Sequence, residues 1–230
     1  MYRKGEVTYQ AIPLPERSTM SEREAMAASA EFLAKMKTRH SVRHYAARAV
    51  PEELIVNCIA AAGTAPSGAN HQPWFFAAIS DTSMKAQIRE AAESEEKAFY
   101  SGGAGEEWLA ALEPIGTGVA KPHLTDAPWL IVVFAQRWGV TQDGQRYKNY
   151  YVPESVGIAV GMLITAIHHA GLVCLEHTPN PMKFLPELCG RPASEKAVMI
   201  LPVGYPADDA TVPAVAKRKK PLDQIMAVFR

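Results

Sequence analysis

The chain has 230 residues, with 24 basic and 24 acidic side chains and no net formal charge. This length fits one domain that buries most of its apolar surface. The balanced charge argues against a nucleic-acid partner, because neither basic cluster is long enough to follow a phosphate backbone. No apolar run approaches the roughly 20 residues that span a bilayer, and the first residues lack the apolar core of a signal peptide. We therefore expect a soluble, cytoplasmic protein without membrane contact.

The three cysteines, Cys58, Cys174 and Cys189, have no paired or metal-type spacing. Cys58 and Cys174 stand in apolar sequence, which predicts buried, reduced thiols. His168 and His169 are adjacent on a predicted helix and so point apart, and no Gly-x-Ser-x-Gly motif occurs. Metal chemistry and nucleophilic hydrolysis therefore have little support, and we expect no metal site.

The predicted elements begin after an N-terminal arm, residues 1–20, in which prolines and polar residues favour extended chain. Ser21 and Glu24 form a capping box, and the alanine-rich segment after it predicts a helix through Lys37. Pro51 at a first helical position and the acidic residues after it predict a second helix. The apolar face of that helix comprises Leu54, Ile55, Cys58, Ile59 and Ala62.

The rest of the chain alternates strands and helices. Apolar runs predict strands over 74–80, 129–136, 172–176 and 198–203, and helical periodicity predicts helices over 83–100 and 182–188. Small and apolar residues cover most faces of 153–170, which predicts a central helix buried nearly all round. Glycines within 101–120 favour a mobile lid. The pattern indicates one α+β domain over residues 21–230.

The loop from Ala62 to Trp74 has residues suited to contact a flat, oxygen-rich ligand. Pro66 lacks a backbone donor, Ser67 adds a hydroxyl, and Gly68 permits a close backbone approach. Loops of this composition are more often plain turns. The loop alone therefore leaves both interpretations open.

Two basic clusters, Arg39 to Arg43 and Lys217 to Lys220, could together hold one phosphate. With Lys37-Thr38 and the Pro221 to Ile225 segment beside them, they resemble the nitroreductase-like flavoprotein superfamily. From Lys35 to Met226 the chain resembles, more narrowly, the iodotyrosine deiodinase family. The motifs that carry this resemblance are the 62–74 loop, Glu96 with Tyr100 and Lys121, His177-Thr178-Pro179, Leu201 to Pro206, and Pro221 to Met226.

The resemblance implies a nitroreductase-like fold: a central, mostly antiparallel sheet flanked by helices, in an intertwined homodimer with FMN at the interface. The N-terminal arm and the C-terminal tail, residues 207–230, are the segments expected to reach across to the partner. In the family, the segment matching Arg39, His40, Ser41, Val42 and Arg43 contacts the phosphate and ribityl chain of the flavin. One departure concerns the terminal phosphate contact, which is an arginine in the family. That position is Lys219 here, so either Lys219 or the adjacent Arg218 holds the phosphate.

The flavin ring itself is contacted, in the family, by the segments matching Pro66, Ser67 and Gly68 and matching Glu176, His177 and Thr178. Thr178 matches the residue whose hydroxyl lies near the reactive ring nitrogen N5. A donor at that nitrogen makes stepwise electron transfer accessible beside hydride transfer. Thr178 is therefore the catalytic residue that the resemblance predicts.

Glu96 and Tyr100 stand four residues apart, on one face of a predicted helix, and Lys121 follows the glycine-rich segment. Spacing alone is more typical of a solvated surface. In the family, however, the matching residues close over the α-amino and α-carboxyl groups of a halotyrosine, within a lid over about 95–121. The backbone of the residue matching Ala69 receives the phenolate.

The implied activity is FMN-dependent reductive dehalogenation of halogenated tyrosines, such as 3-iodotyrosine to tyrosine and iodide. NAD(P)H or a separate reductase would supply the electrons. Three alternatives remain open. One is the flavin-consuming enzyme that makes the lower ligand of cobalamin, which resembles the loop region but has no evident need for Glu96, Tyr100 and Lys121. A general FMN-dependent nitroreductase or quinone reductase would need no group that binds a zwitterion, and a non-catalytic protein would bind flavin or an aromatic amino acid without turnover.

Overall fold

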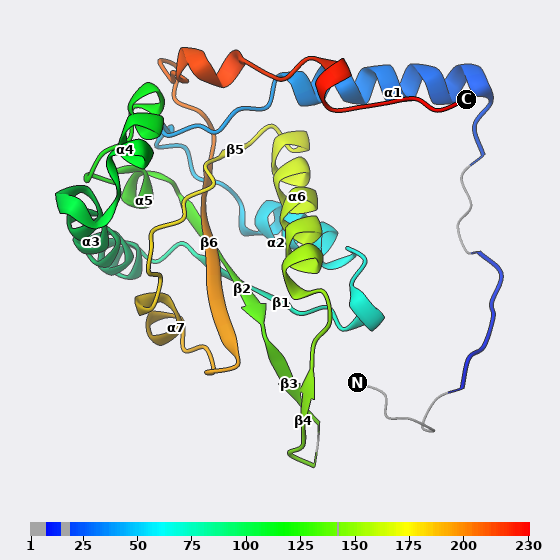
Figure 1. Ribbon diagram of the computed structural model, residues 1–230, viewed down its shortest axis with the longest axis horizontal. Coiled ribbons are helices and arrows are strands. Elements are labelled where there is room, and N and C mark those ends of the chain that lie inside the picture. The colour runs from blue at the N-terminus through cyan, green and yellow to red at the C-terminus, as the bar shows by residue number, and fades with distance from the viewer. Residues whose placement is uncertain (1–7, 15–18, 142) are drawn as a thin grey trace.

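A computed structural model describes residues 8–14, 19–141 and 143–230 (Figure 1). The strands are β1 (Trp74–Ile79), β2 (Trp129–Gln136), β3 (Trp138–Val140), β4 (Arg146–Lys148), β5 (Val173–Cys174) and β6 (Glu195–Gly204). The α-helices are α1 (Glu22–Lys37), α2 (Glu52–Gly63), α3 (Thr82–Ala98), α4 (Glu106–Leu112), α5 (His123–Asp126), α6 (Val152–His169) and α7 (Phe184–Leu188). Residues 1–7 and 15–18 of the expected arm lie outside the described part of the chain, and 8–14 form neither helix nor strand.

The main sheet has the strand order β1-β2-β6-β5, and each neighbouring pair is antiparallel. The two inner strands carry apolar side chains on both faces because helices cover both sides. In β2, for example, Ile131 and Val133 face one side of the sheet while Leu130 and Val132 face the other. The α+β class and the antiparallel sheet flanked by helices are confirmed.

Each face of the sheet has its own hydrophobic core. Helices α2 and α6 pack on one face, where Ile55, Cys58 and Leu163 are buried. Helices α3, α5 and α7 pack on the other face, through Ile88, Leu124 and Leu185 among others. The covered sheet is thus a rigid base from which the loops at its ends project.

Helix α1 begins as its sequence predicts. Glu24 accepts a hydrogen bond from the backbone N–H of Ser21, and Ser21 accepts one from the backbone N–H of Glu24, which completes the capping box. No residue of α1 is buried, and Met26, Phe32 and Leu33 are exposed. The helix and the C-terminal tail run together away from the body of the molecule (Figure 1).

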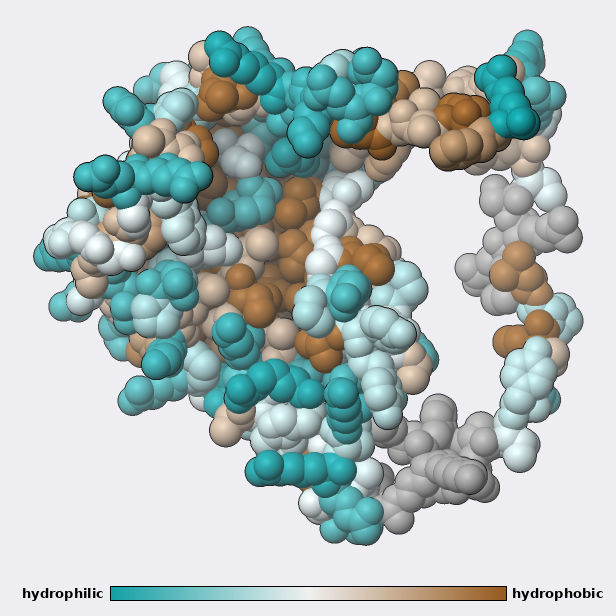
Figure 2. Space-filling model, viewed as in Figure 1, coloured by the Kyte–Doolittle hydropathy of each residue, from teal (hydrophilic) through white to brown (hydrophobic). Residues whose placement is uncertain are grey.

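Helix α6 corrects one expectation. Ser155, Val156, Ala159, Val160, Leu163 and Ile167 face the core, but Gly157, Ile158 and Gly161 are exposed, so within one chain the helix is not buried nearly all round. Figure 2 shows apolar surface where α6 lies and along α1. By length and composition alone α6 could cross a membrane, although a core helix of a globular domain passes the same test.

Two further segments differ from the expected elements. The glycine-rich stretch 101–120 contains helix α4 as well as turns, and the predicted helix over 83–100 ends at Ala98 in a π-helical turn, Phe99–Gly103. A hairpin of β3 and β4, which projects from one end of the molecule in Figure 1, was not predicted. Its strands are only three residues long, too short for a clear alternation of polar and apolar residues.

Candidate functional site

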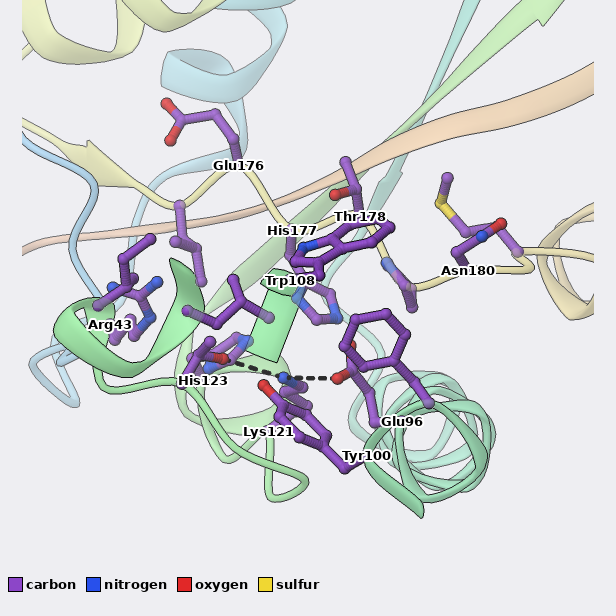
Figure 3. Close-up of a pocket in the computed structure, with 17 residues that line it drawn as sticks. Arg43, Glu96, Tyr100, Trp108, Lys121, His123, Glu176, His177, Thr178 and Asn180 are labelled. Carbon is purple, nitrogen blue, oxygen red and sulfur yellow. Dashed lines mark hydrogen bonds and ion pairs between the residues drawn. The ribbon is translucent and has the colours of Figure 1, made fainter. Parts of the chain in front are cut away.

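A cavity of about 480 Å³ lies between the lid and the chain that follows β5 (Figure 3). The lid side carries Glu96, Tyr100, Trp108, Thr117 and Lys121, and the opposite side carries Glu176, His177, Thr178 and Asn180. The fold thus brings together two groups of predicted residues that are far apart in sequence, Glu96 to Lys121 and Glu176 to Thr178. Arg43 lines the same cavity.

A buried ion pair occupies the lid side of this cavity. Nζ of Lys121 lies 3.1 Å from Oε2 of Glu96, and their side chains are only 3% and 13% exposed. Lys121 also donates to the hydroxyl of Thr117 at 3.2 Å, and its Nζ lies 5.8 Å from the ring centre of Tyr100. When a zwitterion binds, a largely buried cation can pair with its carboxylate and the neighbouring anion with its ammonium group, in place of pairing with each other.

Glu93, one turn before Glu96 on α3, fixes the position of the Lys121–Glu96 pair (the clamp). Its Oε1 accepts hydrogen bonds from the backbone N–H of Lys121 at 2.7 Å and from Nε of Arg89 at 2.8 Å. The bond from the Lys121 backbone is the main reason why the pKa of Glu93 lies below its usual value. Lys121 is thereby anchored to α3 at its backbone and again at its side chain.

Aromatic packing holds the lid together. The ring of Phe99 packs edge-on against Tyr100 at 5.3 Å and against Trp108 of α4 at 5.2 Å. Trp108 is nevertheless 56% exposed, and it faces Thr178 across the cavity in Figure 3. The lid therefore carries an aromatic wall that a flat ligand could contact.

Two histidines form the deep end of the cavity. The rings of His123 and His177 meet edge to face at 5.1 Å, and within the described chain neither Nε2 atom has a hydrogen-bond partner. Burial lowers the pKa of His123 to about 4, and Lys121 contributes in the same direction. Burial is the main cause that lowers the pKa of His177, to about 3, and the neighbouring His123 is the second. Both imidazoles are therefore neutral at pH 7.

Some of the basic residues predicted to bind phosphate lie together, whereas Arg43 lines the cavity under the lid. Arg39, His40, Lys217 and Lys219 line a second cavity, of about 470 Å³, between the end of α1 and the C-terminal tail. Arg218 does not line it. Ser41 is tied to β5 by a bridge to Cys174, and the N–H of Val42 donates to the Cys174 carbonyl at 3.0 Å. This arrangement can bind an anion.

The loop at Ser67 has a strained, tightly fitted backbone. Ala69, Asn70 and Gln72 have φ angles of 51°, 54° and 49°, which are left-handed values that side chains disfavour. A Cβ at Gly68 would lie 2.6 Å from the carbonyl oxygen of Tyr150, so only glycine fits there. Such strain persists where the surroundings fix the backbone, and it is concentrated at functional sites.

This loop does not line the cavity under the lid of its own chain. Gly68 instead donates its N–H to Ser155 of α6 at 3.3 Å, and in Figure 1 the loop lies on the far side of the sheet from α3 and α4. Of the predicted residues, Pro66, Ser67, Gly68 and Ala69 thus stand apart from the others within one chain.

Sequence reasoning missed several residues of the site. His123, Trp108 and Thr117 line the cavity, and Glu93 anchors Lys121. His123 could have been noticed because it follows Lys121 by two positions, and Glu93 because it precedes Glu96 by three on the same helix. No sequence signal marked Trp108, since its partners on the lid are set by tertiary packing.

The described chain is an α+β domain with two cavities, one lined by basic residues and one that holds the paired Lys121 and Glu96 under the lid. Comparisons with known proteins agree with this class. The model of the nitroreductase family matches residues 36–205. The iodotyrosine deiodinase of Haliscomenobacter hydrossis is 50% identical over 197 residues, which cover 86% of this chain and 89% of that protein. Human iodotyrosine deiodinase 1 is 41% identical over 226 residues, covering 98% and 77% respectively.

A crystal structure of oxidised iodotyrosine deiodinase bound to FMN and 3-iodo-L-tyrosine superposes with a TM-score of 0.70 at 32% identity, covering 86% of this chain and 98% of that chain. The chain belongs to the nitroreductase family and, within it, to the iodotyrosine deiodinases. The resemblance found in the sequence is thereby confirmed.

Proposed function

We propose that the protein catalyses the FMN-dependent reductive dehalogenation of halogenated tyrosines. The observation that carries this proposal is the buried pair of Lys121 and Glu96, at 3.1 Å, in a cavity that Thr178 also lines. A nitroaromatic or a quinone has no pair of opposite charges, so a general reductase has no use for such a clamp. An α-amino acid has one positive and one negative group, which complement the negative and positive groups of the clamp.

The clamp suits the two ends of an α-amino acid. Lys121 would donate to the carboxylate of the ligand, Glu96 would accept from its ammonium group, and the hydroxyl of Tyr100 can bridge to either. The neutral histidines beneath the clamp add no positive charge that would repel the ammonium. Trp108 and Phe99 on the lid exclude water from the ring of the ligand.

The described residues fit FMN. The cavity of Arg39, His40, Lys217 and Lys219 offers the positive charge that a phosphate needs, and it favours Lys219 over Arg218 as the terminal contact. When bound and reduced, FMN supplies two electrons. The exposed hydroxyl of Thr178 is available to donate a hydrogen bond to the ring edge. The dehalogenation takes two electrons and one proton: the carbon–halogen bond breaks, a carbon–hydrogen bond forms, and halide leaves.

A second copy of the chain would complete the site. The loop of Pro66 to Ala69 lies away from the cavity of its own chain, so in this proposal it reaches the cavity of a partner, where the Ala69 backbone receives the phenolate. The exposed apolar face of α6 and the unburied helix α1 support a homodimer. So do the exposed tail residues Leu222, Ile225, Met226, Val228 and Phe229. NAD(P)H or a separate reductase would deliver the electrons.

The test is an anaerobic titration of the dithionite-reduced, FMN-loaded protein with 3-iodotyrosine. Flavin absorbance, iodide and tyrosine are measured together. Stoichiometric reoxidation with release of both products is the expected result. If 3-iodotyrosine leaves the flavin reduced while nitroaromatics or quinones oxidise it, the protein is a general flavin reductase instead. Binding without reoxidation by any acceptor would indicate a non-catalytic binding protein.

A further inference from the structure

Glu176 brings a carboxylate into the group of residues that the family resemblance assigns to the phosphate and ribityl chain of FMN. The hydroxyl of Ser41 donates to its Oε2 at 2.5 Å, and Nη1 of Arg39 lies 3.6 Å from its Oε1. Arg39 also lines the cationic cavity with His40 and Lys219. A negative side chain is thus held by two of the groups that an anionic ligand would need.

Backbone hydrogen bonds on both sides of Glu176 fix the position of its Cα. On one side of Glu176, the Cys174 carbonyl accepts the N–H of Val42 at 3.0 Å. On the other side, His177 and Ile200 exchange backbone hydrogen bonds of 2.9 and 2.8 Å. The Cα of Glu176 therefore cannot withdraw without breaking the sheet edge, and only its side chain can rotate away from Ser41.

A phosphate bound to the same residues conflicts with this arrangement. Ser41 has one hydroxyl hydrogen, which it can donate to the Glu176 carboxylate or to a phosphate oxygen but not to both. Arg39 can serve both anions only by dividing its donors between them. Two negative groups on shared partners also repel each other at short range, and partial burial weakens the screening by solvent.

We propose that Glu176 is a built-in competitor for the phosphate of FMN. In the cofactor-free protein its carboxylate holds Ser41 and Arg39 in place and offsets their charge, and loading of FMN requires the side chain to release them. The inference rests on the proposed function, because it takes FMN as the ligand. Its consequence is selective: Glu176 weakens the binding of a phosphorylated flavin but not of riboflavin, which has the same ring and ribityl chain without the phosphate.

The experiment compares flavin binding by the full-length, cofactor-free protein and its E176Q variant. Dissociation constants for FMN and riboflavin are measured by quenching of flavin fluorescence at fixed ionic strength. We expect E176Q to bind FMN about tenfold more tightly, since a single short-range charge repulsion is removed, while its affinity for riboflavin changes less than threefold. E176T, which also removes the charge, should shift FMN affinity in the same direction. E187Q removes an exposed carboxylate on α7 and should change neither constant.

Four results would overturn the proposal. If E176Q and E176T weaken FMN binding, the carboxylate assists the cofactor and does not compete with it. An equal gain for FMN and riboflavin would mean that Glu176 acts on the ring or the ribityl chain, and no change would mean that it is a bystander. If the unmodified protein binds neither flavin, the proposed function itself fails and this inference falls with it.

Discussion

Among single residues, the most instructive is Lys121, because its two anchors have different consequences. Its backbone is held by Glu93 and its ammonium group by Glu96, so the position of the cation is set before any ligand arrives. A ligand with only one charged end would replace only one partner and leave the other buried without compensation. Under the proposed function, the clamp would therefore select for zwitterions, because a molecule with a single charge leaves one of the two charges unpaired.

Replacing Lys121 by Met should impair the binding of a halotyrosine without impairing the reduction of a nitroaromatic acceptor. We expect the affinity for 3-iodotyrosine to fall about 100-fold, since removing one partner of a buried charge pair costs a few kcal/mol. Turnover of a nitroaromatic acceptor should stay within about threefold of the unmodified rate, because it makes no use of the clamp. K97M, one residue beyond Glu96 but exposed, is the matched control. An equal loss of both activities would show that Lys121 acts through the fold of the lid.

Thr178 calls for a different substitution, because what matters is its hydroxyl and not its shape. T178V keeps the branched side chain and removes the donor. The exposed position of Thr178 on the cavity wall makes a folding defect small. Stopped-flow reoxidation by 3-iodotyrosine should slow by about 10- to 100-fold, within the range of a lost hydrogen bond to a reacting group. The dissociation constant of the halotyrosine should be unchanged, and a rate equal to that of the unmodified protein would exclude the assigned role.

Among the elements, those with complete local signals could be predicted from sequence. Helix α1 follows from its capping box, and the residues of β2 from an unbroken apolar run buried on both faces. The clamp residues were predicted by resemblance, since their spacing alone is typical of a solvated surface. What could not be predicted is set by tertiary contacts. Trp108 packs α4 against Phe99. The exposed side of α6 has apolar residues that one chain leaves uncovered.

The lid is the element for which ligand-linked ordering is expected. Its glycines, including Gly102 with φ of 122°, separate α3 from α4, and we expect the segment to open as a unit. Binding of 3-iodotyrosine at the clamp should close it and slow cleavage by a glutamate-specific protease at Glu106, Glu107 and Glu113 by at least about tenfold. Cleavage sites are identified by mass spectrometry. K121M, treated with the same ligand concentration, should remain unprotected, and equal cleavage with and without ligand in the unmodified protein would contradict the mechanism.

For the whole molecule, the surfaces that one chain leaves open are the surfaces that a second copy would cover in the proposed homodimer. The loop at Gly68 is strained, fixed against Tyr150, and remote from its own cavity, while α1 and the tail extend beyond the body (Figure 1). In an isolated chain, the loop at Gly68 has a strained backbone, and α1 and the tail expose apolar surface to water. Both raise the free energy of the isolated chain. A second copy that covers α6 and receives the loop would account for all of them together.

The stability of the whole molecule should depend on pH through the two buried histidines. Their folded-state pKa values, about 4 for His123 and about 3 for His177, lie below the usual 6.5. The unfolded chain therefore takes up protons first as the pH falls, so stability is fully present above about 6.5 and is lost between 6.5 and the folded values. Between pH 7 and pH 5 we expect a loss of about 2 to 4 kcal/mol, or roughly 5 to 15 °C in Tm.

Thermal unfolding of the full chain at half-unit intervals from pH 8 to pH 4.5 measures this loss. The lowered pKa of Glu93 affects stability only below pH 4.5, its ordinary value, so it does not obscure the effect of the histidines. H123Q and H177Q should each flatten the slope, and the double variant should remove most of it, whatever their Tm at pH 7. A Tm that stays constant from pH 7 to pH 5 would mean that the protonated imidazoles find hydrogen-bond partners or solvent. In that case the part of the cavity around the two histidines would open without global unfolding.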